Sequence, residues 1–276
     1  MDVRMVSYAD NHEDVMLQRA LPADGGGFYI DVGAYDPTMH SVTKHFYDRG
    51  WRGINVEPNP APFRKLNAAR ARDTNLNIGL SDRAGTLKIY EAPDACWSVD
   101  PDLLAGWFQA DRSTIIERAI PVRTLAEVCE EHVPPGTTVS FLKVDVEGHE
   151  FAVLSGGDWS RWRPRVVLVE AGDQGRWEPI LLGHGYRFAF FDGVNRFYVR
   201  DEDANLLPIL AYPANPGDRY AIHGYMARID DLEAQVAQLG GCSPATLRLA
   251  SWMHRLAGRS PGLKRLARPI VRRLAG

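Results

Sequence analysis

The chain has 276 residues, of which 45% are hydrophobic and 24% are charged, and its formal net charge is -3. This length suits one large domain or a domain with an appendage, and the slightly acidic balance argues against a nucleic-acid partner. Three widely separated cysteines without zinc-ligand spacing favour a reducing compartment. No run of about 18 apolar residues predicts a membrane span, and the start, MDVRMVSYADNHEDVML, lacks the apolar core of a signal peptide. We therefore expect a cytoplasmic protein.

From about residue 28 to residue 200, β-rich runs alternate with helical patterns. The runs are FYIDVG, GINVEP, NLNIGL, VSFLKVDV and RVVLVEA. Several are apolar throughout rather than alternating, as in strands covered on both faces. Candidate helices lie at 41–50, 60–71 and 124–132, and the last begins with a capping box of Thr124 and Glu127. YRFAFFDGVNRFYVR predicts two antiparallel strands joined by an Asp-Gly turn. The alternation predicts an α/β domain with a largely parallel sheet and an antiparallel edge hairpin.

Two segments depart from this alternation. Residues 91–118 have no strong periodicity, and they predict either a lid or substrate insertion or a surface excursion with its own apolar cluster. Between Ile222 and Leu239, apolar residues recur every three or four positions, as in a short heptad seam. A helix of this length is marginal alone, so we expect it to pack on the core or on a second copy, and we favour a dimer. We divide the chain into a domain at 1–205 and a helical, basic extension at 206–276.

The end of the extension is basic and amphipathic. After Glu233 it contains eight basic residues and no acidic residue, interleaved with leucines and Trp252. Such a segment can lie in an anionic membrane interface, where each cation contributes about 1 kcal/mol. Alternatively, its apolar side packs on the acidic body or on a dimer partner. We favour packing and keep peripheral contact with the inner membrane face as a hypothesis.

The turn after the first predicted strand indicates a ligand, because ligands bind beyond the carboxyl ends of parallel strands. This turn runs from Asp31 to Pro37 and contains Gly33. Tyr35 and Thr38 occupy the places of the second and third glycines of a dinucleotide fingerprint, and a pyrophosphate needs the second one. This argues against NAD or FAD. S-adenosylmethionine has no phosphate and fits better, although a lone glycine is also common at an ordinary turn.

Polar residues follow the next two predicted strands. Glu57, followed by Pro58 and Asn59, can accept hydrogen bonds from a ribose diol, or it is a solvated acid beside a helix N-terminus. Ser81 and Asp82 can hydrogen-bond an adenine amino group, or they shape the turn that follows.

The densest group of ionisable residues follows the fourth predicted strand. Asp145, Glu147 and His149 come directly after an apolar run, and Glu170 ends the fifth run. Such carboxylates can hold a hard cation or take a proton from a substrate hydroxyl, unless they merely cap the next helix. We take Asp145, Glu147 and His149 as catalytic candidates, and Asp145 with Glu170 as candidate Mg²⁺ ligands.

These stretches resemble the FkbM family of S-adenosylmethionine-dependent methyltransferases. The matching segments are SYADNHEDVML, FYIDVGAYDPTMHSVTKHFYDRGWRGINVEPNP, LNIGLSD, LKVDVEGHEFAVLSGGDWSRWRP and VVLVEA, in family order between Ser7 and Arg200. The resemblance implies a Rossmann-like, seven-stranded methyltransferase fold. It also implies O-methylation of a hydroxyl, often on a sugar, and a polysaccharide, an oligosaccharide or a glycosylated natural product remains open as acceptor.

The resemblance also implies which residues face the cofactor. It places the methionine end at Gly33 and its neighbours, the ribose at Glu57 and the adenine at Ser81 and Asp82. The cofactor-binding residues that we expect are Tyr8, Asp31, Gly33, Ala34, Tyr35, Ser41, Glu57, Pro58, Asn59, Ser81 and Asp82.

Two positions depart from the family pattern, and one rival function remains. Related chains often read GAND or GANH where this chain has Gly-Ala-Tyr-Asp, and they often have Gln where it has Asp10. The rival is a non-catalytic nucleoside-binding or glycan-binding module that kept the fold and lost the chemistry. Activity with sugars would separate the two.

Overall fold

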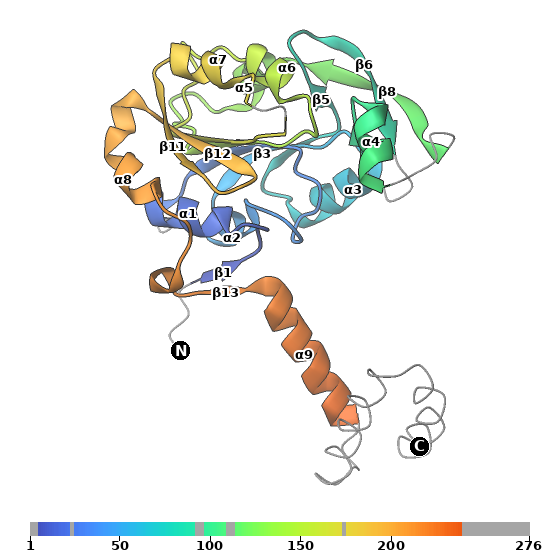
Figure 1. Ribbon diagram of the computed structural model, residues 1–276, viewed down its shortest axis with the longest axis vertical. Coiled ribbons are helices and arrows are strands. Elements are labelled where there is room, and N and C mark those ends of the chain that lie inside the picture. The colour runs from blue at the N-terminus through green and yellow to red at the C-terminus, as the bar shows by residue number, and fades with distance from the viewer. Residues whose placement is uncertain (1–4, 23–24, 92–96, 109–113, 173–174, 239–276) are drawn as a thin grey trace. The chain divides into compact units, whose positions relative to one another are not determined.

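The computed structural model describes residues 5–22, 25–91, 97–108, 114–172 and 175–238 (Figure 1). The chain divides into two compact units, Met1–Ala221 and Ile222–Gly276. The first unit carries every site residue that the sequence predicts.

A seven-stranded sheet forms the centre of the first unit, in the order β11-β12-β10-β9-β2-β3-β4. From β4 to β10 neighbouring strands are parallel, and β12 and β11 add the antiparallel edge. This confirms the predicted fold class and the edge hairpin. The strands are β2 (Phe28–Val32), β3 (Arg52–Val56), β4 (Thr74–Leu76), β9 (Phe141–Val144), β10 (Val166–Glu170), β11 (Tyr186–Phe191) and β12 (Asn195–Arg200).

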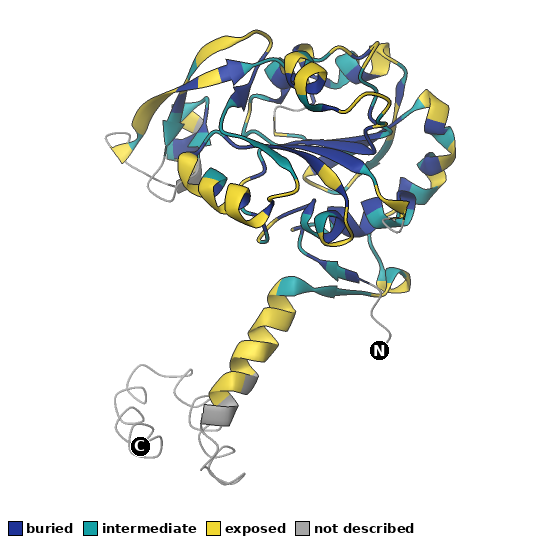
Figure 2. Cartoon of the chain, turned by 180° about the vertical axis from the view of Figure 1, so that it is seen from behind, coloured by how far each residue is buried: buried dark blue, intermediate teal, exposed yellow. Residues whose placement is uncertain are grey.

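Helices cover both faces of this sheet, and successive residues of one strand therefore enter different cores. In β2, Ile30 packs in one apolar cluster with residues of α5 and α6, whereas Tyr29 packs in another with residues of α1 and α2. Figure 2 shows the buried strands between the helices. The helices of the unit are α1 (Glu13–Ala20), α2 (Lys44–Asp48), α3 (Pro60–Ala69), α4 (Pro101–Phe108), α5 (Leu125–His132), α6 (Glu150–Ser155), α7 (Glu178–Gly183), η3 (Asp201–Leu206), α8 (Leu207–Leu210) and η4 (Pro216–Asp218).

Local sequence signals set several helix ends. The predicted capping box is confirmed at α5, where Thr124 Oγ1 accepts from the Glu127 N–H at 3.1 Å and Glu127 Oε2 accepts from the Thr124 N–H at 2.9 Å. The helix expected over 41–50 is shorter, because its first residues belong to the turn after β2. The run NLNIGL is not one strand. It divides into β4 and β5 (Gly79–Leu80), which belong to different sheets.

The insertion is larger than the predicted 91–118 and is built as a second sheet. Strands β6 (Gly85–Glu91), β7 (Trp97–Ser98) and β8 (Ile116–Arg123) join β5 in the order β5-β8-β6-β7. Its buried cluster of Ile89, Ile120 and Val122 has Leu87, Trp97 and Val99 packed against it. Trp97 and Val99 of the expected segment pack on this cluster, but its core comes from strands on either side of that segment. The role of the segment as a lid stays a prediction.

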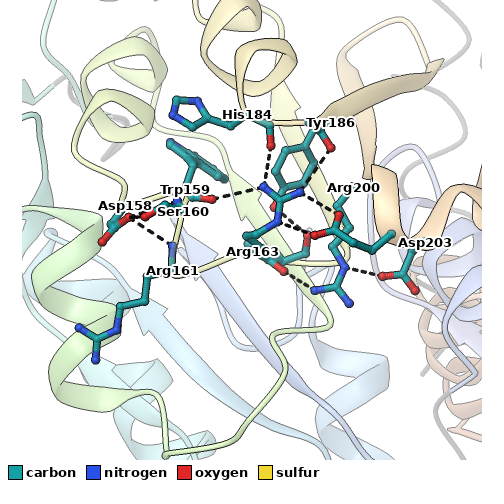
Figure 3. Close-up of polar contacts among 12 residues, drawn as sticks. Asp158, Trp159, Ser160, Arg161, Arg163, His184, Tyr186, Arg200 and Asp203 are labelled. Atoms are coloured by element: carbon teal, nitrogen blue, oxygen red, sulfur yellow. Dashed lines mark hydrogen bonds and ion pairs between the residues drawn. The ribbon is translucent and has the colours of Figure 1, made fainter.

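A network of opposite charges fixes the antiparallel edge to the segment that follows it (Figure 3). Arg163 donates to the carbonyl of His184 at 2.6 Å and to Glu202 at 2.7 Å. Arg200 donates to the carbonyl of Arg163 at 2.8 Å and to Asp203 at 2.5 Å. These contacts connect the loop before β10, the end of β12 and η3.

The first unit extends beyond the predicted boundary at residue 205. The short helix α8 lies against α1, and Arg19 of α1 donates to the carbonyl of Ile209 at 2.9 Å and to Asp218 at 3.1 Å. Strand β13 (Tyr220–Ile222) pairs with β1 (Met5–Ser7) near the N-terminus. These contacts move the boundary to Ala221.

The described part of the second unit is the helix α9 (His223–Gln238), which contains most of the predicted seam. On this helix taken by itself, the seam residues Tyr225, Ile229 and Leu232 are exposed. Self-association through them stays a prediction. The basic tail lies outside the described residues, as does Leu239 of the seam. No described helix is both long and apolar enough to cross a membrane.

Candidate functional site

A cavity of about 370 Å³ lies at the carboxyl ends of β2, β3 and β9. This volume is within the range of small-molecule and cofactor sites. Part of its wall is polar and comes from the loops after these strands. The small second sheet supplies an apolar part, which consists of Leu80, Leu87, Ile89, Trp97, Val99 and Ile120.

Gly33 turns the backbone sharply after β2. Its φ is +81°, and a Cβ atom built there would lie 1.8 Å from the carbonyl oxygen of Asp145. The N–H groups of Gly33 and Ala34 both donate to the carbonyl of Val56, at 3.0 and 3.1 Å. The loop after β2 is therefore held between the loops of its two neighbouring strands. Any side chain at this position would displace one of them.

Glu57 is buried, lines the cavity and is held at both of its oxygens. Oε1 accepts from the Asn59 N–H at 2.7 Å, and Oε2 accepts from the Tyr35 N–H at 2.9 Å. Burial raises the pKa of Glu57 to about 7. Each carboxylate oxygen has two acceptor sites, so each can still accept a hydroxyl from a ligand. Ala34, Tyr35, Pro58 and Asn59, which the sequence predicts as cofactor-binding residues, also line the cavity. Their contact with a cofactor stays a prediction.

Lys143 of β9 joins three parts of the site, and sequence reasoning missed it. Its Nζ donates to the carbonyl of Gly33 at 2.8 Å and lies 3.2 Å from Asp145 Oδ2 and 3.5 Å from Asp31 Oδ1. Burial alone would lower the pKa of Lys143, but the carboxylates of Asp145 and Asp31 raise it overall. The lysine is therefore charged and fixes the Gly33 turn. A lysine inside an apolar run gives no clear signal of this role.

Asp31 does not line the cavity, but its contacts stabilise the turn after β2. Its Oδ2 accepts from Thr43 Oγ1 at 3.0 Å, and burial raises its pKa. Two other predicted cofactor residues lie outside the lining. Ser41 Oγ accepts from Arg70 Nη2 at 3.0 Å, and the Tyr8 N–H donates to Asp14 at 2.7 Å. Their contact with a cofactor stays a prediction.

Asp145, Glu147 and Glu170 form a cluster of three carboxylates, whose ligand atoms all lie within 4.8 Å of one another. We call it the carboxylate cluster. Burial, followed by the charge of Asp145, raises the pKa of Glu147 to about 7 and that of Glu170 to about 9. Like charges this close favour either a shared proton or a bound cation. The structure thus brings together both predicted metal ligands and two of the predicted catalytic residues.

The loop that carries Glu147 is conformationally unusual. Glu147 has a φ of +57°, which is rare for a residue with a side chain, and Gly148 follows with a φ of +99°. Ser98 of β7 donates its hydroxyl to the Glu147 carbonyl at 2.7 Å. The second sheet therefore holds the backbone of this loop beside the cavity.

His149 lines the cavity but is already engaged. Its Nε2 lies 3.1 Å from Ser81 Oγ, which also donates to Asp82 at 3.1 Å. Burial lowers the pKa of His149. Ser81 and Asp82 are not among the lining residues, although their neighbour Leu80 is. Their predicted role at an adenine stays a prediction.

The cavity also includes residues that sequence reasoning missed, from the N-terminal segment, the turn after β2 and β12. Glu13 Oε1 accepts from Asn195 Nδ2 at 2.7 Å, and burial raises the pKa of Glu13 to about 8. His40 Nδ1 lies 2.5 Å from Asp10 Oδ1. The rule that ligands bind at strand ends does not predict these side chains, because most lie outside the turns that directly follow a parallel strand.

Comparison with known proteins found a family and a relative to which this chain is similar. The family profile described as "Methyltransferase FkbM domain" matches residues 31–188, which run from the end of β2 to the start of β11. A protein from Sordaria araneosa, Methyltransferase sdnD, is 28% identical to this chain over 179 residues, which cover 55% of this chain and 67% of that protein.

Proposed function

Because this chain belongs to the FkbM family of S-adenosylmethionine-dependent methyltransferases, we propose that it methylates a hydroxyl oxygen of a sugar or glycan. The observation that carries the proposal is one cavity lined by both Glu57 and the acids Asp145 and Glu147. Glu57 can accept hydrogen bonds from the diol of a nucleoside, and Asp145 and Glu147 can accept a hydrogen bond or a proton from an acceptor hydroxyl.

The residues present fit the cofactor. The Gly33 turn lets backbone approach a ligand closely, Glu57 can accept the ribose hydroxyls, and the apolar wall at Leu80 and Ile120 suits an adenine ring. When bound, S-adenosylmethionine supplies a methyl group that its sulfonium already activates. The chain therefore has to orient the acceptor oxygen and remove a proton.

Two roles are open to the carboxylate cluster. Asp145 or Glu147 can orient the hydroxyl and accept its proton. Alternatively, Asp145 and Glu170 hold Mg²⁺, which would lower the pKa of a bound hydroxyl. Chelation separates these roles. If methyl transfer survives exhaustive treatment with EDTA, the carboxylates act without a metal; if it is lost and Mg²⁺ restores it, they are ligands.

The test of the function has two stages. Isothermal titration with S-adenosylhomocysteine should show binding to the wild type. Methyl transfer from radiolabelled S-adenosylmethionine to a panel of methyl glycosides and oligosaccharides should then show turnover. Binding without turnover on any glycan would instead support the non-catalytic module. If the wild type does not bind S-adenosylhomocysteine, the proposed function is contradicted.

A further inference from the structure

The geometry points to His40, oriented by Asp10, as the group that takes the proton from the acceptor hydroxyl. This inference rests on the proposed function, which leaves the proton acceptor open. His40 lies in the turn after β2 and Asp10 in the segment before α1, and both line the cavity that also contains Gly33, Glu57 and Asp145.

The two side chains have the arrangement of an oriented base. His40 Nδ1 lies 2.5 Å from Asp10 Oδ1, so the ring donates from Nδ1 and its Nε2 carries the free lone pair. Among the described residues, no group hydrogen-bonds Nε2. The His40 side chain is 53% exposed, which leaves Nε2 accessible to an entering acceptor. A carboxylate that fixes the tautomer of a histidine in this way also stabilises the imidazolium that forms.

The backbone at His40 is held in an unusual conformation. Its φ is +61°, a left-handed value that costs energy for a residue with a side chain. Buried Arg70 fixes the residues on both sides. Its Nη2 donates to the carbonyl of Pro37 at 2.7 Å and to Ser41 Oγ at 3.0 Å. Asp36 Oδ1 accepts from two further N–H groups of the same turn. Because the buried guanidinium of Arg70 holds this turn by hydrogen bonds, we expect His40 to keep one orientation.

The other bases in the cavity are less free. His149 Nε2 is engaged by Ser81 at 3.1 Å. Asp145 faces Lys143 at 3.2 Å, and its two carboxylate neighbours lie within 4.8 Å. A proton taken there stays inside a crowded cluster, whereas a proton on His40 leaves directly to solvent. Asp145 and Glu147, which line the same cavity, can then orient the hydroxyl.

The proposed step balances as follows. The acceptor oxygen uses a lone pair to form the new bond to the methyl carbon, and the electron pair of the carbon–sulfur bond stays on the departing sulfur. The O–H proton passes to the lone pair of His40 Nε2, and its bonding pair remains on the oxygen. The products are the methyl ether, the neutral thioether and an imidazolium paired with Asp10. Water then takes the proton.

The first readout does not depend on turnover. Long-range ¹H–¹⁵N spectra of histidine-labelled wild type, compared with His40→Gln for assignment, report the tautomer of His40. We expect the Nδ1–H form in the wild type and a mixture of tautomers in Asp10→Asn. An Nε2–H form in the wild type, or identical spectra in wild type and Asp10→Asn, would overturn the assignment.

The second readout uses pooled methyl glycosides as acceptor probe. His40→Ala should lower kcat about 10²–10⁴-fold, the usual contribution of a general base, with unchanged affinity for S-adenosylhomocysteine. Added imidazole should restore part of the rate to His40→Ala and leave the wild type unaffected. Asp10→Asn should lower kcat by less than His40→Ala does, with little change in KM.

Controls separate the possible failures. His184→Ala, an exposed histidine whose ring contacts the carbonyl of Ile180, should keep full activity. If the wild type binds S-adenosylhomocysteine and His40→Ala keeps wild-type turnover, the proton-acceptor role is wrong and the proposed function stands. If the wild type does not bind it, the proposed function fails first. His40→Ala could also lose activity that added imidazole does not restore, while Asp10→Asn leaves the tautomer of His40 unaltered. That result would contradict the role of His40 as the proton acceptor.

Discussion

Two charged clusters lie at opposite ends of β10. One pairs arginines with acids, and the other consists mainly of acids. At the amino end of β10, Asp203 accepts from Arg165 at 2.7 Å and from Arg200, and Glu202 accepts from Arg163 at 2.7 Å. We call this the arginine network. Figure 3 shows the contact between Arg200 and Asp203. At the carboxyl end of β10, Glu170 joins the carboxylate cluster, in which Asp145 lies 3.2 Å from Lys143.

The carboxyl pKa values show the consequence. The hydrogen bond from Arg163 lowers the pKa of Glu202 to about 2, whereas burial and the neighbouring acids raise that of Glu170 to about 9. Opposite charges stabilise the ionised form, and like charges destabilise it. The arginine network therefore contributes to folding, and the carboxylate cluster costs stability that a ligand-binding role would explain.

The largest expected effect comes from the turn that joins the cavity to the carboxylate cluster. Gly33→Ala should lower the free energy of unfolding by about 3 kcal/mol and abolish binding of S-adenosylhomocysteine, because its Cβ would overlap the Asp145 carbonyl. Gly50→Ala is the matched control. It has a φ of +89° with no atom within 4 Å of the added Cβ, so it should cost only about 1 kcal/mol and keep binding. Equal losses in thermal denaturation would show that the contact with Asp145 does not matter.

Breaking the arginine network should affect stability alone. Arg163→Ala removes donors from Glu202 and from the His184 carbonyl, and we expect a loss of about 2 kcal/mol with unchanged affinity for S-adenosylhomocysteine. Arg161→Ala, which removes an exposed pair with Glu130, should change stability by less than about 0.5 kcal/mol. A large change of ligand affinity in Arg163→Ala would contradict the division between the two clusters.

The carboxylate cluster should respond in the opposite direction. The folded-state pKa of Glu170 is about 9 and lies above its unfolded value. Ionisation of Glu170 therefore destabilises the folded state, and the free energy of unfolding falls as pH rises toward about 9. Glu170→Gln should therefore raise the free energy of unfolding by about 1 kcal/mol near pH 8, about 2–4 °C in melting temperature, and by less near pH 5.

Glu202→Gln is the control of opposite sign. Its folded-state pKa is depressed, so its contribution is present above the unfolded pKa and disappears as pH falls toward about 2. The substitution should destabilise the protein slightly near neutral pH. If Glu170→Gln destabilises the protein near pH 8 as well, the carboxylates of the cluster do not repel one another.

Sequence reasoning predicted the parts that local chemistry dictates. The apolar runs of β2, β3, β9 and β10, the cap at Thr124 and the turn before β12 follow from burial, hydrogen bonding and turn geometry. The positions of Glu57 and the carboxylate cluster were predictable because ligands bind beyond the carboxyl ends of parallel strands. Sequence reasoning missed the second sheet, because β5 and β7 have two residues each and few residues of the longer strands β6 and β8 are buried, so none of them gives an apolar run.

Long-range pairing accounts for the other omissions. Asp10 and His40 are separated by 30 positions, and only the folded chain brings them together. Lys143 reads as an interruption of an apolar strand until its contacts with Gly33 and Asp145 are seen. Asp10 departs from the family pattern, but the sequence alone does not identify His40 as its partner.

The most direct test of the central claim is the affinity of Glu57→Ala for S-adenosylhomocysteine, measured by titration calorimetry. Hydrogen bonds to a charged group contribute about 1.5–3 kcal/mol each, so losing the ribose contacts should weaken binding well over tenfold. Circular dichroism should show a folded variant, and Glu117→Ala, on β8 outside the cavity, should bind like the wild type. Wild-type affinity in folded Glu57→Ala would contradict the placement of the nucleoside in this cavity.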